Sequence, residues 1–218
     1  MSGYPIYLTQ LHSSLCVVVG GGPVAERKVD SLLAAGAQVK IISPALSKGL
    51  AHLVAAGAVT YLPRPYQKGD LQGAFLVIAA TGDSEVNRAV AREAGELQML
   101  VNVVDVPSRS NFYVPAVVRR GALTLTVSTD GHSPALAAHI RRQLEASYGT
   151  EYAALLELLG ELRGMVIDSH PPRERGEIWC RLIDSDLLEL LRQDKYKEAR
   201  EMALSLIRRP SENPIEKG

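Results

Sequence analysis

Short apolar runs alternate with segments of helical composition over the first half of the chain. Leu15 to Val19 is a continuous, valine-rich apolar run, which is typical of a strand buried on both faces. Apolar residues at helical spacing follow from Val24 to Ala35, and a second apolar run extends from Val39 to Ile42. Because strands and helices keep alternating, we expect a parallel sheet with helices on both faces. The later elements of this pattern are expected at Leu46–Ala56, Val59–Leu62, Phe75–Ala80, Ser84–Ala94 and Met99–Val104.

The pattern changes in the second half of the chain, where Leu123 to Ser128 alternates apolar and hydroxyl-bearing residues. That period of two predicts a strand with one polar face. Ser133 and Pro134 form a typical helix start, with serine as N-cap and proline at the first helical position. From Glu151 onward the composition is almost wholly helical, with one apolar stripe, and residues 210–218 are predicted to be disordered.

Charge and composition exclude several classes of protein. Lys and Arg total 24 and Asp and Glu total 24, so no overall field favours nucleic acid or a membrane surface as a partner. The start of the chain lacks a signal-peptide pattern, and no apolar run approaches the roughly 20 residues that span a bilayer, so we expect a cytoplasmic protein. Cys16 and Cys180 are expected to be reduced thiols, with Cys16 in a core. No His/Cys cluster has metal-ligand spacing, so no metal site is predicted.

A glycine-rich turn directly follows the first predicted strand. It matches the pattern G-x-G-x-x-G/A and opens a predicted helix, which is the setting of a dinucleotide-binding turn. Such a turn brings backbone close to a pyrophosphate, whose charge then faces free N–H groups and the positive end of the helix. A glycine-rich turn without a ligand is the simpler alternative. The predicted cofactor-binding residues of this turn are Gly20, Gly21, Gly22, Pro23, Val24 and Ala25.

Two other strand ends contribute to the predicted cofactor site. The second strand is followed by Ser43 and Pro44, at a position where many NAD sites carry an acid that binds the ribose. No arginine follows closely to bind a 2′-phosphate, so NAD is predicted in preference to NADP. Ala80 and Thr81 end another strand at the same edge, although Thr81 as an ordinary turn residue is an alternative.

Asn102 and Asp105 come at the end of the next predicted strand. Ligands of parallel sheets bind outside the carboxyl ends of the strands, so we expect Asn102 to contact the cofactor and Asp105 to lie near it. A carboxylate there can accept a proton while a hydride leaves in the other direction, which dehydrogenation requires. An aspartate that only shapes the turn before Pro107 is the alternative.

Four motifs recur in an order that resembles one known family. They are Gly20 to Lys28, Asn102 to Asp105, Phe112 to Ala116, and Gly131 to Pro134. With them the chain resembles the precorrin-2 dehydrogenase / sirohydrochlorin ferrochelatase family, which also forms the N-terminal part of multifunctional siroheme synthases. The similarity extends over about Tyr4 to Gly164.

The resemblance implies an α/β fold with three parts. These are a Rossmann-type NAD-binding domain over residues 1–112, a small α+β dimerisation domain over 113–148 that makes a homodimer, and a helical C-terminal domain over 149–209. The implied activity is NAD-dependent oxidation of precorrin-2 to sirohydrochlorin. It also implies that Asp105 is the catalytic residue for dehydrogenation. The alternative hypothesis is a bifunctional enzyme that also inserts Fe²⁺, as a substrate, and there too Asp105 is the implied catalytic residue. A nucleotide-sensing regulatory module is a second alternative.

Precorrin-2 is a tetrapyrrole rich in carboxylates, so its site requires local positive charge on a chain that is neutral overall. A short stretch of the sequence supplies several arginines and a polar loop. For the arginines a solvated face is the alternative, and for the loop histidine it is no role at all. The predicted substrate-binding residues are Arg109, Arg119, Arg120, Ser128, Thr129, His132 and Arg141, and Arg142 belongs to the same basic stretch.

Overall fold

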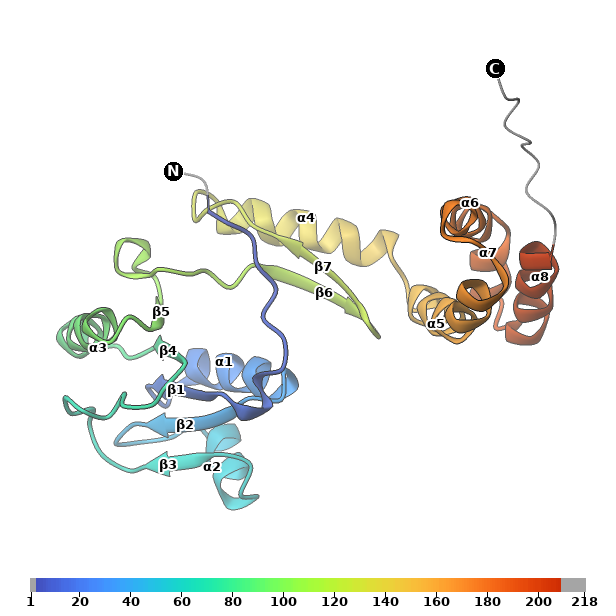
Figure 1. Cartoon of the computed structure of the whole chain (residues 1–218). Coiled ribbons are helices and arrows are strands. Elements are labelled where there is room, and N and C mark those ends of the chain that lie inside the picture. Colours follow the sequence, from blue (N-terminus) through green and yellow to red (C-terminus); the bar gives the residue numbers. More distant parts are fainter. Residues whose placement is uncertain (1–2, 209–218) are drawn as a thin grey trace. The chain divides into compact units, whose positions relative to one another are not determined.

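The computed structural model describes residues 3–208, so the predicted disordered tail lies outside the described residues. The chain divides into two compact units, the first ending at Val114 and the second beginning at Pro115 (Figure 1). Each unit is described by itself. Within residues 3–208 no helix combines the length and the apolar composition needed to cross a bilayer.

The first unit is built on a five-stranded parallel sheet in the order β3-β2-β1-β4-β5 (Figure 1). This confirms the Rossmann-like α/β arrangement predicted from the alternating pattern. The strands are β1 (Leu15–Val19), β2 (Gln38–Ile42), β3 (Thr60–Leu62), β4 (Leu76–Ala79) and β5 (Leu100–Val103). The helices are η1 (Leu11–Ser13), α1 (Pro23–Ala34), α2 (Lys48–Ala55), α3 (Ser84–Glu96) and η2 (Pro107–Arg109).

A separate apolar core fills each face of this sheet, which explains why β1 is apolar throughout. Cys16 and Val18 of β1 pack with α1 and α2, whereas Val17 and Val19 pack with α3 on the other face. Cys16 is fully buried, as predicted, and burial raises the pKa of its thiol to about 11. Both cysteines are free thiols.

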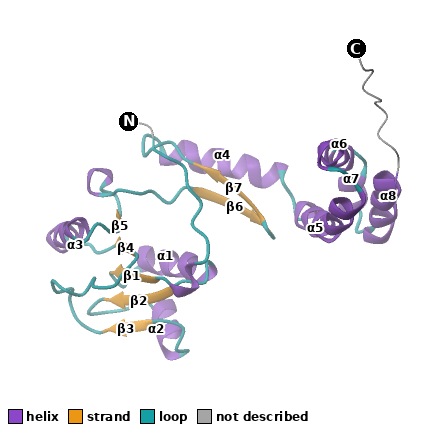
Figure 2. Cartoon of the chain, in the orientation of Figure 1, coloured by secondary structure: helices purple, strands orange, loops and turns teal. Residues whose placement is uncertain are grey.

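The second unit begins with an antiparallel pair of strands, β6 (Ala116–Arg120) and β7 (Leu123–Val127), and α4 (Pro134–Ser147) contacts both (Figure 2). The alternation around Leu123 predicted β7. The sequence analysis did not identify β6, because its Ala-Val-Val-Arg-Arg run carries no clear period; its hydrogen bonds come from pairing in register with β7.

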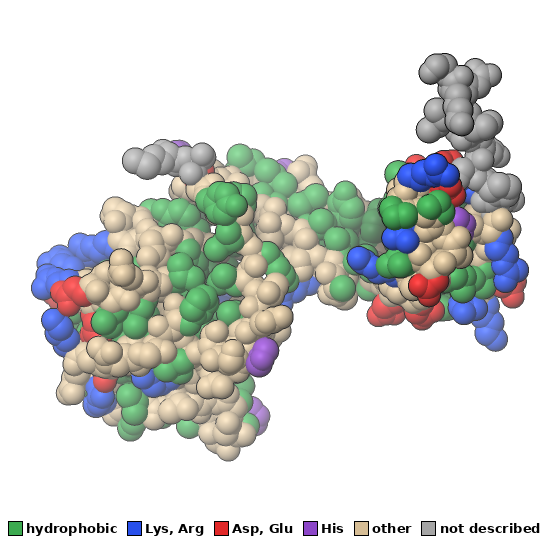
Figure 3. Space-filling model, in the orientation of Figure 1, with side chains coloured by type: hydrophobic (Ala, Val, Ile, Leu, Met, Phe, Trp, Pro, Cys, Tyr) green, Lys and Arg blue, Asp and Glu red, His purple; other side chains and the backbone are tan. Residues whose placement is uncertain are grey.

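Four helices follow and share one apolar core. It includes Leu158 and Leu162 of the first of them, at helical spacing, together with Leu182, Leu187 and Ile207 from the other three. Acidic and basic side chains are mixed on the face of these helices that Figure 3 shows. The helices are α5 (Glu151–Ser169), α6 (Pro172–Ile183), α7 (Leu187–Arg192) and α8 (Tyr196–Arg208).

Gly160 and Gly164 lie on the exposed side of α5, and a Cβ added at either would meet no atom within 4 Å. Because glycine loses more backbone entropy than alanine in a helix, Gly160→Ala and Gly164→Ala should each raise the free energy of unfolding by about 0.5–1 kcal/mol. Urea unfolding followed by circular dichroism measures this. Gly36→Ala is the opposite control, because Gly36 ends α1 at φ +80° and alanine there should destabilise. Unchanged or lower stability of both α5 variants would contradict the prediction.

Candidate functional site

The ends of four strands meet at the carboxyl edge of the first unit's sheet. The chain runs from β1 to β2 and β3 on one side, then returns to place β4 and β5 on the other side of β1. The order therefore reverses between β1 and β4, which is where parallel α/β sheets bind their ligands. Gly20, Ser43, Ala80 and Asp105 follow these strand ends, so the fold brings the predicted cofactor and catalytic residues of this unit to one edge.

Two glycines of the turn are fixed by close backbone contacts. Gly20 has φ +126°, and a Cβ there would lie 2.4 Å from the Ala80 carbonyl oxygen. A Cβ at Gly21 would lie 1.9 Å from the carbonyl oxygen of Ala45. Neither position accepts a side chain without backbone movement. The turn is therefore held between the loops that follow β4 and β2.

The other residues of the turn form a cradle that fits a pyrophosphate. A Cβ at Gly22 would meet nothing within 4 Å, and no side chain of residues 3–208 caps α1, so the N–H groups of its first turn face outward. Pro23 is exposed at the first helical position and Val24 is half-buried, whereas Ala25 is fully buried against the sheet. The open space and outward N–H groups fit a nicotinamide dinucleotide bound through its phosphates.

The loop after β2 is braced against this turn. The buried Ser43 hydroxyl donates a hydrogen bond to the Ala45 carbonyl at 2.7 Å, and the Ser47 N–H donates to the Gly21 carbonyl at 2.7 Å. Pro44 is exposed between them. The Ser43 proton is therefore already used within the loop, and Ser43 can meet a ribose only as an acceptor.

Glu26 is a residue that the sequence analysis missed. Ser47, the N-cap of α2, donates its hydroxyl proton to the Glu26 carboxylate of α1. A Cβ at Gly49 would lie 2.2 Å from the Glu26 Oε1 atom, so a side chain there would displace this carboxylate. This contact joins α1 to α2 behind the glycine turn, and nothing in the local sequence pattern indicates it because the partners are 21 residues apart.

Thr81, after β4, is held by a buried amide. Its hydroxyl donates to Asn87 Oδ1 at 2.9 Å, and Asn87 Nδ2 donates to the Thr81 carbonyl at 3.0 Å. Asp83 follows as the N-cap of α3. Asn87 was also missed, although a polar residue on the buried face of a predicted helix is a signal that could have found it. These bonds fix the shape of the loop next to Gly20.

Side-chain hydrogen bonds close the outer edge of β5. Asn102, which is buried, donates from Nδ2 to the Phe112 carbonyl at 3.0 Å, and the Val103 N–H donates to Ser110 Oγ at 2.9 Å. Asn111 accepts from the Val101 N–H at 2.7 Å through its side-chain oxygen. The segment after η2 thus runs back along β5 and secures the turn between them.

Asp105 occupies that turn with a left-handed backbone, φ +60°. The Val106 N–H donates to the Val103 carbonyl at 3.2 Å, which closes the turn around it. The side chain is exposed and accepts no hydrogen bond from residues 3–208. Aspartate tolerates this backbone better than most residues, so the turn presents a carboxylate at the sheet edge with little strain.

Lys28 of α1 lies within reach of the Asp105 charge. Burial lowers the pKa of the half-buried Lys28, the charge of Arg27 lowers it further, and the Asp105 carboxylate opposes both. Lys28 is the last residue of the motif that begins at Gly20, and no role was predicted for it. A lysine one to two turns into a dinucleotide-binding helix has no local signature of function.

The predicted substrate arginines are placed differently from one another. Arg109 is half-buried at the end of η2 in the first unit, four residues after Asp105. In the second unit Arg119 is exposed on β6, whereas the Arg120 guanidinium donates to the carbonyls of Tyr148, Glu145 and Arg119 at 2.8 to 3.0 Å. Arg120 therefore ties β6 to the end of α4.

Arg141 and Arg142 follow each other on α4 but have different surroundings. Arg141 forms an ion pair with Glu145 at 2.6 Å, one turn further along the helix. Arg141 is half-buried, whereas Arg142 is exposed. A surface pair of this kind is weak and can exchange for a ligand, so Arg141 stays available to an anion.

Ser128, Thr129 and His132 form one compact loop between β7 and α4. Thr129 accepts from the Ser133 N–H through its hydroxyl at 3.1 Å, and its carbonyl accepts from the His132 N–H at 2.8 Å. The His132 ring contacts the same carbonyl through Nδ1 at 3.0 Å, which leaves Nε2 facing outward. Ser128 Oγ accepts from the Asp130 N–H at 3.2 Å.

The hairpin register separates this loop from Arg119 and Arg120. Val127 pairs with Ala116, whereas Arg120 pairs with Leu123 at the other end of the two strands. The two ends are four residue steps apart along the strand, roughly 13 Å at the usual rise per residue. The structure therefore does not gather all of the predicted substrate residues of this unit into one cluster.

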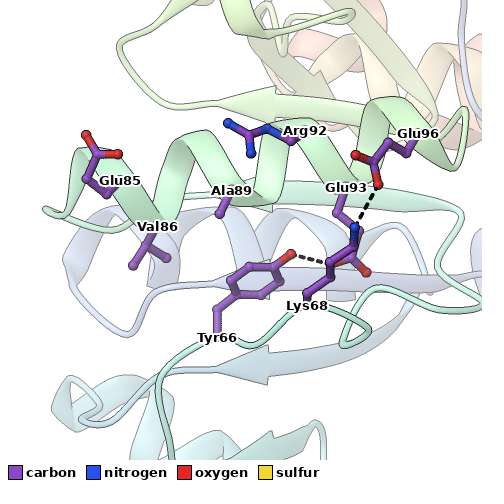
Figure 4. A pocket seen from close by; sticks show the side chains of 8 residues that line it. All are labelled: Tyr66, Lys68, Glu85, Val86, Ala89, Arg92, Glu93 and Glu96. Atoms are coloured by element: carbon purple, nitrogen blue, oxygen red, sulfur yellow. Dashed lines mark hydrogen bonds and ion pairs between the residues drawn. The ribbon is translucent and has the colours of Figure 1, made fainter.

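A pocket of about 370 Å³ lies elsewhere on the first unit, between α3 and the segment before β4 (Figure 4). Tyr66 donates its phenol to the carboxylate of Glu93, which also accepts from the Gly69 N–H, and Lys68 pairs with Glu96 at 3.2 Å. Burial and Glu93 raise the pKa of Tyr66. These groups satisfy one another, so the pocket is a structural junction away from the predicted site. Among residues 3–208 no cluster of His, Cys, Asp and Glu could hold a metal.

The first unit also matches a known family. The family model described as NAD(P)-binding matches residues 7–116, which is half of the chain. The chain belongs to this NAD(P)-binding family. A second family model, described as "Sirohaem biosynthesis protein central", matches residues 120–147. The first match agrees with a nicotinamide cofactor and does not distinguish NAD from NADP.

Siroheme synthases are among the relatives of this NAD(P)-binding chain. It is 39% identical over 208 residues to the siroheme synthase of Thioalkalivibrio sulfidiphilus (strain HL-EbGR7), a match that covers 94% of this chain and 42% of the relative. It is 43% identical over 166 residues to that of Methylobacillus flagellatus (strain ATCC 51484 / DSM 6875 / VKM B-1610 / KT), covering 76% and 35%. The chain thus spans less than half the length of the curated relatives it matches.

The solved structure of a protein named "SirC, precorrin-2 dehydrogenase" is similar over almost the whole chain. Its TM-score is 0.76 at 28% sequence identity, and the match covers 93% of this chain and 99% of that one. Together with the family models and the siroheme synthases, it confirms the resemblance that the four motifs indicated.

Proposed function

We propose that this chain oxidises precorrin-2 to sirohydrochlorin with NAD⁺. The observation that carries the proposal is the exposed Asp105 carboxylate, held by its turn at the same sheet edge as the glycine cradle. The names of the relatives, siroheme synthases and a precorrin-2 dehydrogenase, support the choice of substrate.

The chemistry assigns Asp105 the role of base. Oxidation of one carbon–carbon unit of the macrocycle removes a hydride and a proton. When bound, the nicotinamide supplies the acceptor for the hydride. Asp105 accepts the proton, because its carboxylate is exposed at the strand end and takes no hydrogen bond from residues 3–208 that would occupy its lone pairs.

NAD is the proposed cofactor in preference to NADP. The loop that follows β2 runs from Ser43 to Ser47 and carries no basic residue that could bind a 2′-phosphate. Ser43 and Pro44 at its start, Ala80, Thr81 and the turn from Gly20 to Ala25 are the proposed contacts. Asn102 has its amide N–H bound to the Phe112 carbonyl, so we propose that it acts through the position of the β5 turn.

The substrate carboxylates require cations. We propose Arg109, Arg119 and Arg141 as groups that bind them, since their guanidinium groups are not committed to backbone carbonyls of the described residues as that of Arg120 is. Ser128, Thr129 and His132 are proposed as hydrogen-bonding contacts of the same substrate.

A homodimer is the proposed assembly, with the dimerisation domain over residues 113–148. The sheet of β6 and β7 has two strands, and within this unit α4 contacts both of them. Helix α4 is 14 residues long and buries Ala137 alone within the described chain, while Leu136 is exposed. A second copy that covered this unit would bury the remaining apolar surface.

Anaerobic turnover tests the proposal. Purified protein with precorrin-2 and NAD⁺ should produce sirohydrochlorin and NADH in equal amounts, followed by their absorbance, and NADP⁺ should support a slower reaction. Adding Fe²⁺ against a control without protein measures whether the chain also inserts iron as a substrate. No turnover with either nucleotide would reject the proposal and favour a nucleotide-sensing module instead.

A further inference from the structure

Lys28 lies beside the Asp105 turn because both pack on the same face of the sheet. Its neighbours on α1, Ala25 and Val29, are fully buried in the core of that face. Val104, the residue before Asp105, packs against the same core. Helix α1 and the β5 turn therefore contribute to one core on the same face of the sheet, and the charge of Asp105 reaches Lys28 from that turn.

The Lys28 ammonium has no bonded partner in this position. It makes no hydrogen bond or ion pair with any residue of the described range 3–208, and yet the Asp105 charge acts on it. A half-buried ammonium has lost part of its hydration, so an anion that reaches it gains more than at an exposed lysine. The two charged groups therefore lie close enough to interact through their charges, but they form no ion pair.

The position on the helix separates Lys28 from the phosphate cradle. It is five residues after Pro23, the first residue of α1, which places it roughly 8 Å along the axis at the usual rise of an α-helix. The positive end of the helix dipole and the N–H groups that suit a pyrophosphate belong to the first turn. Lys28 instead lies toward the turn that holds the proposed base.

We propose that Lys28 binds a carboxylate of the tetrapyrrole substrate and so holds the substrate beside Asp105. The inference rests on the proposed function, because it takes precorrin-2 as the substrate. It makes Lys28 a substrate-binding residue in the helix that follows the glycine turn. An ammonium suits one carboxylate oxygen at a time, as expected for a flexible propionate or acetate side chain.

Three variants test the role of Lys28. Lys28→Met keeps the apolar stem and removes the charge, Lys28→Arg keeps the charge, and Arg27→Met removes the neighbouring charge from an exposed position. In anaerobic assays Lys28→Met should raise KM for precorrin-2 about 10-fold, with kcat within about twofold, while Lys28→Arg and Arg27→Met stay within about threefold of the unmodified chain. The affinity for NAD⁺, measured by calorimetry, should be unchanged in all three.

Two further readouts separate binding from a structural role. Because removal of a desolvated ammonium relieves its burial cost, Lys28→Met without ligands should unfold at a temperature equal to or above that of the unmodified chain. The rise of KM with salt should also be weaker in Lys28→Met. Suppose that the unmodified chain turns over precorrin-2. A normal KM, a lower melting temperature or an altered NAD⁺ affinity of Lys28→Met would then overturn this inference alone. An unmodified chain without turnover would overturn the proposed function.

Discussion

Replacing Asp105 by asparagine is expected to lower kcat for precorrin-2 oxidation by about 10²–10⁴-fold, the range that a positioned general base contributes. Asparagine has the size of aspartate and cannot accept the proton at neutral pH. The affinity for NAD⁺ should stay the same, because the glycine turn and the loop after β2 do not include Asp105. The measurement is the initial rate of NADH formation under anaerobic conditions with saturating precorrin-2.

The fold should survive this change, which makes the result interpretable. Asp105 has φ +60°, and asparagine adopts a left-handed backbone at least as readily as aspartate. Asp194 offers a matched control, since it has φ 58° in an exposed turn of the second unit. Asp194→Asn should change neither kcat nor stability. If Asp105→Asn keeps the normal kcat, Asp105 is not the base.

Alanine at Gly20 is expected to cost about 3 kcal/mol or more of folding free energy, a large share of the total of about 5–15 kcal/mol for a typical domain. Two effects add: φ +126° is unfavourable for a residue with a Cβ, and that Cβ would lie 2.4 Å from a backbone oxygen of Ala80. The backbone after β1 and β4 would have to separate. Urea unfolding of the whole chain, followed by near-UV circular dichroism and by proteolysis within the first unit, measures the loss of folding free energy.

Gly22→Ala separates the effect on folding from the effect on the cofactor. A Cβ there meets nothing within 4 Å in the protein, so the stability should fall by no more than about 1 kcal/mol, the usual cost of alanine at the N-cap position that Gly22 occupies. The same Cβ would project from the cradle toward a bound pyrophosphate, so the affinity for NAD⁺ should fall about 10-fold. A stable Gly20→Ala protein, or a Gly22→Ala protein with normal NAD⁺ affinity, would contradict this assignment of the two glycines.

The parallel sheet could be predicted because its strands are apolar on both faces. The predicted bounds of β1 are those of the structure, and α1 and α4 begin within one residue of their expected starts. β6 was missed because a short strand with two arginines has no period of its own and forms through its pairing with β7. The division into three domains, the homodimer and the cytoplasmic location stay predictions.

The placement of Gly20 and Asp105 at one edge of the sheet could be predicted, because each follows the end of an apolar strand. The side chains that support them could not be predicted, because their partners lie far along the chain. Asn87, Glu26 and Lys28 owe their surroundings to the packing of α3 and α1 on the sheet. The surroundings of Arg120 could not be predicted either. Its guanidinium was predicted to bind substrate, and in the structure it donates to three carbonyl oxygens.

Asn111 and Ser110 replace the partner strand that β5 lacks on its outer edge, and this has a consequence for motion. The amide protons of Val101 and Val103 bond to their side chains, so moving the segment after the Asp105 turn away from β5 means breaking hydrogen bonds of this edge strand. Hydrogen exchange at these amides should then be as slow as in the interior strands. The backbone that carries the base is thus already ordered at folding, and the entropy of ordering that backbone does not recur with each turnover.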